Sequence, residues 1–268
     1  DTDIKKGDVL VAVNGQRVDH SLNRESYLAV PAKGLEVKFT FKRKGKEHDV
    51  KLHTMSSGAV KNLLYEEWEM DNRAKVDELG KGKIAYIHMR DMGVGELSSF
   101  LKDMHTRTVG KEGIILDLRF NNGGNVHKEV LDFLAQKAHY NWAYRDNKGN
   151  PHPNVTPGDM PIVALVNERS LSDAEVTSNG IKTLGLATIV GTETYRWIIF
   201  TTSASMIDGS TLRLPAWGCY SLDGKDLENT GVAPDIYVKN TFEDRLLGRD
   251  PQLEKGVEVI LKQLEKKN

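Results

Sequence analysis

Cysteine is almost absent from this sequence, and its scarcity excludes two kinds of site. The only cysteine is Cys219, so neither an intrachain disulfide framework nor a thiolate-rich metal centre can form. The HExxH and His-rich spacings that are typical of zinc sites are missing as well. We therefore expect no metal and no cofactor.

Excess charge of one sign and long apolar runs are also missing. The 268 residues include 37 lysines and arginines and 38 acidic residues, a formal net charge of -1. Such a chain has no basic surplus to neutralise phosphates, which argues against a nucleic-acid partner. No stretch approaches the roughly 18 consecutive apolar residues of a membrane span, and the opening DTDIKKGD does not have the form of a signal peptide. A hydrophobic fraction of 39% can still fill a globular core.

The N-terminal part of the chain has the period-two pattern of β-strands. Residues 7–54 alternate apolar and polar side chains across an Asn-Gly and a Lys-Gly turn, which predicts a small, half-exposed sheet. The string IKKGDVLVAVNGQRV resembles the central part of a PDZ domain. Residues 1–57 are therefore interpreted as a partial PDZ domain, with its carboxylate-binding loop expected upstream of Asp1. Residues 58–82 are polar and charged, and we expect a connecting arm with a helix near 66–79.

Beyond the arm, strand and helix patterns alternate up to the C-terminus. Strands are predicted at 83–89, 113–120 and 161–166, and they alternate with helices near 94–107, 126–138 and 172–184. Short strands follow in ATIVG, WIIFTTSASMI and STLRL. A last helix carries apolar residues on one face, namely Leu253, Val257, Ile260, Leu261 and Leu264. The runs IILDL and IVALV lack polar alternation, as strands covered on both faces do. We therefore predict an α/β domain over 83–268, with parallel strands and flanking helices.

Two junctions between a predicted strand and the next helix carry residues that are suited to catalysis. In DLRFNNGGNV, Gly123 and Gly124 let the chain turn sharply with uncovered NH groups, which can form an oxyanion hole. A tight turn without catalysis would use the same glycines. In VNERSLSDAEV, Ser172 can attack a carbonyl while the next NH stabilises the oxyanion. The alternative is that Ser170 or Ser172 only caps the helix, because SerAspAlaGlu is a capping box.

A series of segments resembles, in the same order, the C-terminal region of the tricorn peptidases, relatives of the C-terminal processing peptidases. The segments are YIHMRDMG, DLRFNNGGN, VNERSLSDAE, GLATIVGTET, MIDGS, LENTGVAPDI and GRDPQLEKGVE. The resemblance covers most of residues 60–262. It implies a crotonase/ClpP-like core and a serine endopeptidase that acts on peptides or unfolded chains.

The resemblance also implies roles for individual residues. Ser172 would be the nucleophile, and the oxyanion hole would pair the NH of Asp173 with that of Gly124 or its neighbour Gly123. Glu228 in LENTGVAPDI would complete the charge relay. The weaker alternative for this acid is Asp226, and Asp235 would be structural.

The general base is the part of the machinery that this sequence lacks. The processing peptidases use a lysine after the serine, but none occurs here before Lys225. Tricorn enzymes use a histidine of a SerHis pair ahead of the PDZ domain, and no such pair occurs here. His88 is expected to be a packed strand residue and His127 a surface residue of a helix. The resemblance thus implies that upstream sequence supplies the base, and that residues 1–268 alone are almost inactive.

Three residues are expected to affect substrate binding. The family commonly has glycines after GTxTW, whereas Arg196 and Trp197 bring large side chains to that place and would reshape or block the groove. Asp146 lies near the position at which the family has an acidic specificity residue for basic side chains; a solvated loop acid is the alternative.

The expected partners are a peptide or unfolded-protein substrate, upstream domains of the same protein and, by resemblance, further copies of the chain. The resemblance implies a cytoplasmic location, with the bacterial periplasm as the alternative. Two other functions remain open. One is a peptide-binding scaffold without catalysis, and the other is an acyl-CoA reaction on the related crotonase core, which would leave the SerAspAlaGlu and LENTGVAPD matches unexplained.

Overall fold

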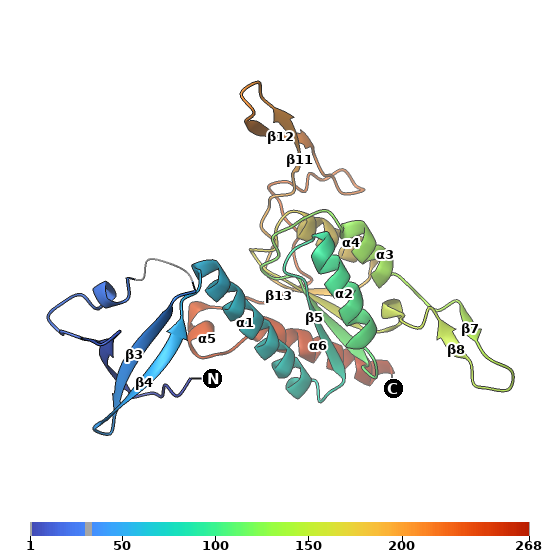
Figure 1. The fold of residues 1–268 in the computed structure, drawn as a ribbon. Helices are drawn as coiled ribbons and strands as arrows, with labels where there is room; N and C mark the ends of the chain where they lie inside the picture. The colour runs from blue at the N-terminus through green and yellow to red at the C-terminus, as the bar shows by residue number, and fades with distance from the viewer. Residues whose placement is uncertain (1, 30–33, 268) are drawn as a thin grey trace. The chain divides into compact units, whose positions relative to one another are not determined.

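The computed structural model describes residues 2–29 and 34–267 and divides the chain into two compact units, Asp1–Trp68 and Glu69–Asn268 (Figure 1). Helix α1 (Ser57–Leu79) contains the boundary between them. Most of the expected connecting arm is therefore this one helix. None of the described helices combines the length and the apolar character needed to cross a membrane.

The first unit is a four-stranded antiparallel sheet in the order β2-β1-β3-β4. Its strands are β1 (Val9–Val13), β2 (Gln16–Arg17), β3 (Glu36–Arg43) and β4 (Lys46–His53), with a short 3-10 helix at Arg24–Tyr27. Both predicted hairpin turns have positive φ at both central residues, 48° and 82° at Asn14-Gly15 and 47° and 83° at Lys44-Gly45. Two-residue hairpins of this kind match the right-handed twist of their strands. The predicted β-rich N-terminal domain is confirmed.

The second unit contains a five-stranded sheet in the order β13-β10-β9-β6-β5, and all of its pairs are parallel. The strands are β5 (Ile84–His88), β6 (Gly113–Asp117), β9 (Ile162–Val166), β10 (Thr188–Gly191) and β13 (Ile236–Tyr237). Strands β5, β6 and β9 are buried along their whole length. This explains why their sequences are almost purely apolar.

Helices cover both faces of the parallel sheet (Figure 1). Side chains of α2 (Val94–Thr106), α3 (His127–Leu134) and α4 (Asp173–Leu184) pack on one face in a cluster with Ile87, Leu116 and Ala164. Val76 of α1 and the apolar residues of α6 (Pro251–Lys267) pack on the other face with Tyr86 and Val163. A short helix, α5 (Phe242–Leu246), precedes α6. The predicted α/β class, with a parallel sheet and flanking helices, is confirmed.

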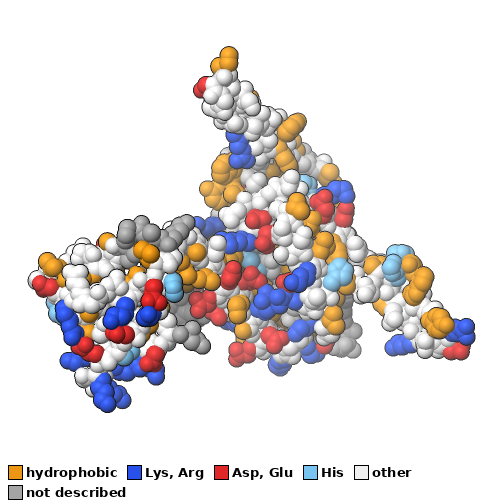
Figure 2. Space-filling model, in the orientation of Figure 1, with side chains coloured by type: hydrophobic (Ala, Val, Ile, Leu, Met, Phe, Trp, Pro, Cys, Tyr) orange, Lys and Arg blue, Asp and Glu red, His pale blue; other side chains and the backbone are white. Residues whose placement is uncertain are grey.

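Two hairpins extend from this layered core (Figure 1). The pair β7 (Tyr140–Trp142) and β8 (Asn150–His152) follows α3, and a 3-10 turn at Pro157–Asp159 leads back to β9. The second pair is β11 (Phe200–Ser205) and β12 (Thr211–Trp217). Both hairpins carry exposed hydrophobic side chains on their surfaces, including Trp142 and Trp217 (Figure 2). The hairpin β7–β8 was not predicted, because every residue of its strands is exposed and no apolar alternation marks it.

A buried ion network fixes the end of β6. The guanidinium of Arg119 is 1% exposed and donates through Nε and Nη2 to Asp117, and through Nη1 to both oxygens of Asp250 at 2.8 Å. The Tyr86 hydroxyl donates to Asp117 at 2.9 Å. Burial alone would lower the pKa of Arg119, but the two carboxylates outweigh it and raise the pKa. The chain that leaves β6 is therefore anchored to the start of α6.

Candidate functional site

Ser172 occupies the corner between β9 and α4 with an unusual backbone conformation. Its φ is 55° and its ψ is -114°, whereas a helix N-cap normally has extended, negative-φ backbone. A non-glycine residue with positive φ costs on the order of 1–3 kcal/mol and persists only where its surroundings hold it, most often at functional sites. The corner is therefore built for more than starting a helix.

Glu175 is the residue that holds this corner. Its side chain is fully buried, and its carboxylate accepts hydrogen bonds from Ser172 N at 3.0 Å, Thr194 Oγ1 at 2.5 Å, Arg196 N at 2.8 Å and Trp197 N at 2.9 Å. One carboxylate thus ties the serine corner to the loop 194–197. In the sequence this glutamate was visible only as the acid of a capping box, which accounts for the bond to Ser172 but not for the other three.

The glycine turn lies directly against the serine corner. A Cβ added to Gly123 would lie 2.8 Å from Ser172 Cβ, 2.9 Å from the carbonyl oxygen of Leu171 and 3.3 Å from the backbone nitrogen of Asp173. The backbone NH of Leu171 donates to the carbonyl of Asn121 at 2.9 Å. The two junctions that the sequence marked separately therefore form one structure.

Hydrogen bonding distinguishes the two glycines of the turn. The NH of Gly123 donates to Oδ1 of Asn121 at 2.9 Å and is therefore occupied. Within residues 2–29 and 34–267, the NH groups of Gly124 and Asp173 have no acceptor. Both of these residues line a hollow together with Ser172. If an oxyanion hole forms here, its donors are the NH groups of Gly124 and Asp173.

If Ser172 is the nucleophile that the resemblance implies, Gly123→Ala should lower the activity by roughly 100-fold or more, because the methyl group would displace Ser172 and misplacement by about 1 Å has an effect of that size. The methyl group has no room, and φ at this position is 76°. Steady-state kinetics on a peptide substrate measures the loss.

Gly185→Ala is the matched control, because Gly185 has a φ of 64° and nothing within 4 Å of an added Cβ. It carries the backbone strain without the crowding, so it should lower stability by about 1 kcal/mol and leave activity unchanged. Equal activity of the Gly123→Ala and Gly185→Ala variants would contradict the close contact between Gly123 and Ser172.

Two hollows of about 180 and 290 Å³ meet at Ser172. Both are lined by Gly124, Ser172, Ile199 and Arg213. Half of the other lining residues are apolar, with Val176, Ile198 and Phe200 in the smaller hollow and Leu171 and Trp197 in the larger one. A chain that crosses Ser172 would therefore have a place for side chains on either side of the serine. The contribution of Arg213 was not predicted, because it comes from the hairpin β11–β12.

The two histidines singled out from the sequence lie outside these hollows. His88 is buried and its Nδ1 lies 2.8 Å from the carbonyl oxygen of Asp117, and burial lowers its pKa, which favours the neutral ring. It is the packed strand residue that was expected. His127, expected on the surface, is partly exposed, but its ring and backbone NH contact the two carboxylate oxygens of buried Asp173 at 2.5 and 3.0 Å. It therefore holds the side chain of Asp173.

Ser170 has a different place from Ser172. It is fully buried, its hydroxyl donates to the carbonyl of Leu118 at 2.8 Å, and it accepts from the NH of Asn167 at 3.0 Å. It thus connects the ends of β6 and β9 and lines neither hollow. The N-cap position of α4 belongs to Ser172.

The substrate-binding residues proposed from the sequence are not brought together. Trp197 lines the larger hollow beside Ser172. Arg196 lines a separate hollow of about 460 Å³ and pairs with Glu193 at 2.9 Å. Asp146 is exposed in the turn of the hairpin β7–β8 and lines none of these hollows.

The predicted acid, Glu228, is partly exposed, and its NH donates to the carboxylate of Asp226 at 2.9 Å. It does not line the hollows at Ser172. The next NH, of Asn229, donates to the carbonyl of Arg196 at 3.2 Å, so this segment lies against the loop that Glu175 binds. Asp235 accepts from the NH of Ile189 and pairs with Lys182, in keeping with a structural role.

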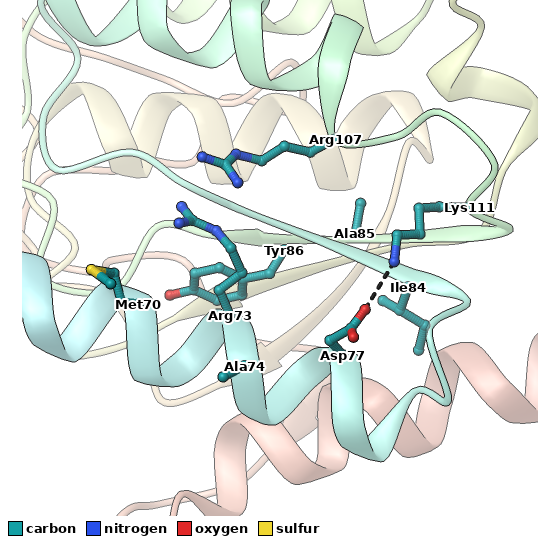
Figure 3. Close-up of a pocket in the computed structure, with 9 residues that line it drawn as sticks. All are labelled: Met70, Arg73, Ala74, Asp77, Ile84, Ala85, Tyr86, Arg107 and Lys111. Atoms are coloured by element: carbon teal, nitrogen blue, oxygen red, sulfur yellow. Dashed lines mark hydrogen bonds and ion pairs between the residues drawn. The ribbon is translucent and has the colours of Figure 1, made fainter.

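A further hollow of about 450 Å³ lies between α1, β5 and the segment after α2 (Figure 3). Arg73, Arg107 and Lys111 reach toward it, and the dashed line in Figure 3 joins Lys111 to Asp77. Each of these basic groups has a carboxylate partner, since Arg73 pairs with Glu69 and Arg107 with Asp103. This hollow combines no nucleophile with free NH groups. The candidate active site is therefore the one at Ser172.

Comparison with known proteins identifies the family of this chain. Residues 83–238 match peptidase family S41, and residues 1–54 match the PDZ domain. Tricorn protease homolog 1 of Streptomyces coelicolor is 31% identical over 98% of this chain and 24% of its own length. The tricorn protease of Thermoplasma acidophilum is 33% identical over 75% of this chain and 19% of its own length.

The crystal structure of the tricorn protease has a TM-score of 0.80 to this chain at 28% identity, over 97% of this chain and 25% of that one. The chain thus spans a quarter or less of the length of these relatives. It belongs to peptidase family S41, its relatives are tricorn proteases, and it carries a PDZ domain ahead of the peptidase region.

Proposed function

We propose that this chain is the catalytic region of a serine peptidase that hydrolyses peptides through an acyl-enzyme on Ser172. The observation that carries the proposal is the strained serine corner beside two NH groups, those of Gly124 and Asp173, that have no acceptor among the described residues. Membership of family S41 supports serine hydrolase chemistry.

In the proposed reaction, Ser172 Oγ attacks the carbonyl carbon of the peptide bond and loses its proton to a general base. The negative charge that develops on the carbonyl oxygen is stabilised by the NH groups of Gly124 and Asp173. The base returns the proton to the leaving amine, and a water molecule then hydrolyses the ester. Peptides or unfolded chains are the proposed substrates.

We propose that the base is a histidine from sequence ahead of Asp1, because neither His88 nor His127 lines the hollows at Ser172. Glu228 would orient that histidine rather than contact the serine. Its segment lies against the carbonyl of Arg196, whose NH is bound by Glu175. A peptide-binding scaffold without catalysis is the second candidate, favoured by the bulk of Trp197 in the larger hollow.

A fluorophosphonate probe tests the proposal on the full-length protein that contains the upstream sequence. We expect a single adduct on Ser172, located by mass spectrometry, together with hydrolysis of unstructured peptides. Residues 1–268 alone should react more slowly by roughly six orders of magnitude, the usual effect of losing a catalytic histidine, because only the oxyanion hole and binding remain. Peptide binding without hydrolysis or labelling by the full-length protein would favour the scaffold.

A further inference from the structure

Arg213 brings a positive charge to the proposed active site. It lies on β12 and lines both hollows that meet at Ser172. Its side chain is exposed, and its Nε donates to the hydroxyl of Thr201 on the paired strand β11 at 2.7 Å, which orients the guanidinium. In the part of the chain that the structure describes, no carboxylate pairs with it. Its other NH groups thus remain available to a ligand.

The surroundings do not neutralise this charge. Asp173 is the acidic residue among those lining the two hollows, and both of its oxygens are taken by His127. By contrast, Arg119, Arg196 and the basic side chains of the hollow in Figure 3 each have a carboxylate partner. An arginine that lines the same hollows as the proposed nucleophile, without a counter-charge among the described residues, is suited to bind an anionic group of the substrate.

We propose that Arg213 binds a substrate carboxylate, so that the site selects peptides with Asp or Glu next to the bond that is cut. The inference rests on the proposed function and adds a substrate class to it. A guanidinium can donate two parallel hydrogen bonds to a carboxylate. Ile199 and Phe200 line the smaller hollow with Arg213 and would cover the methylene groups of an acidic side chain. This preference is opposite in charge to the one that Asp146 had suggested.

A carboxylate could also come from the C-terminus of the peptide. Arg213 lies on the wall that both hollows share at Ser172, close to the reacting centre. A side chain beside the cut bond fits this place without requiring that the chain end there. We therefore assign the site to an acidic side chain and treat the terminal carboxylate as a separate arm of the test.

Hydrolysis by the full-length protein is the first measurement. The substrates are peptides that are acetylated at the N-terminus and amidated at the C-terminus. Each peptide carries Glu, Gln or Lys at the position directly before or directly after the bond that is cut. We expect kcat/KM to be roughly tenfold higher for Glu than for Gln, the effect of one charge-assisted interaction of moderate strength. Arg213→Gln should abolish the ratio, and Arg213→Glu should reverse it in favour of Lys. Arg145→Gln, on the other hairpin, is the matched control and should keep the wild-type ratio.

Binding to the Ser172→Ala protein, measured by fluorescence anisotropy, is the second measurement and needs no turnover. The Glu peptide should bind roughly tenfold more tightly than the Gln peptide, and only while Arg213 is present. Absence of hydrolysis together with this binding preference would refute the proposed function and leave only the carboxylate-binding role of Arg213. Equal binding and equal hydrolysis of the Glu and Gln peptides would overturn the inference that Arg213 binds an acidic side chain. A preference confined to peptides with neutral side chains and a free α-carboxylate would also overturn the inference, because Arg213 would then bind the C-terminus of the peptide.

Discussion

Ser172→Ala is expected to lower kcat for peptide hydrolysis by the full-length protein by a factor on the order of 10⁴ or more, because the acyl-enzyme can no longer form. The residual rate would come from the NH groups of Gly124 and Asp173, which the substitution leaves in place. Steady-state kinetics gives the factor, and loss of fluorophosphonate labelling shows that it reflects loss of the nucleophile.

Ser170 provides a matched control two residues away. Its hydroxyl is buried and bonded to Leu118 and Asn167, so Ser170→Ala should lower the free energy of unfolding by about 1–3 kcal/mol through the unsatisfied groups it leaves. Labelling of Ser172 should continue in this variant. The opposite result would be a folded Ser170→Ala protein that the fluorophosphonate does not label, together with a Ser172→Ala protein that it does label. That result would show that the nucleophile has been assigned to the wrong serine.

Arg119→Leu is expected to lower the free energy of unfolding by roughly 3–5 kcal/mol, the usual result of removing one partner from a buried ion pair. Asp117 is fully buried and would lose its counter-charge, and Asp250 would lose both of its bonds to the guanidinium. Such a loss is large beside the 5–15 kcal/mol that typically stabilises a whole domain. Urea unfolding followed by circular dichroism measures it.

Arg249→Leu is the surface counterpart. Arg249 pairs with Asp244 at 2.8 Å, but its side chain is 52% exposed. Exposed pairs of this kind contribute about 0–1 kcal/mol, so the unfolding midpoint should barely change. If Arg119→Leu were no more destabilising than Arg249→Leu, the network would not hold the end of β6 as described.

The core of the second unit could be predicted because its signals are local. Continuous apolar runs such as IVALV mark strands that are buried on both faces, and the structure buries β9 completely. The same rule could not find the hairpin β7–β8, whose residues are all exposed and need no apolar pattern. Nor could the sequence show that the polar arm is mainly one helix, α1, because only Val76 and Asn72 of that helix are buried.

For the site, the sequence indicated the backbone better than the side chains. Strands β6 and β9 are parallel neighbours, with Asp117 opposite Leu165, so the loops that follow them must come together at one sheet edge. The sequence marked the two junctions separately, and only the resemblance to the tricorn peptidases paired Ser172 with the glycine turn. Arg213 depends on where a distant hairpin folds back, and no periodicity reports that. The catalytic and binding roles of all these residues stay predictions, and neither Glu228 nor Asp146 lines the hollows at Ser172.

The positive φ of Ser172 lowers the stability of the protein at the position proposed for the nucleophile. Any residue with a side chain carries the conformational cost at this corner, and glycine would remove it. Selection for a higher free energy of unfolding alone would therefore favour glycine at position 172. If Ser172 is the proposed nucleophile, the conformational cost at this corner is what the protein carries to have a hydroxyl there.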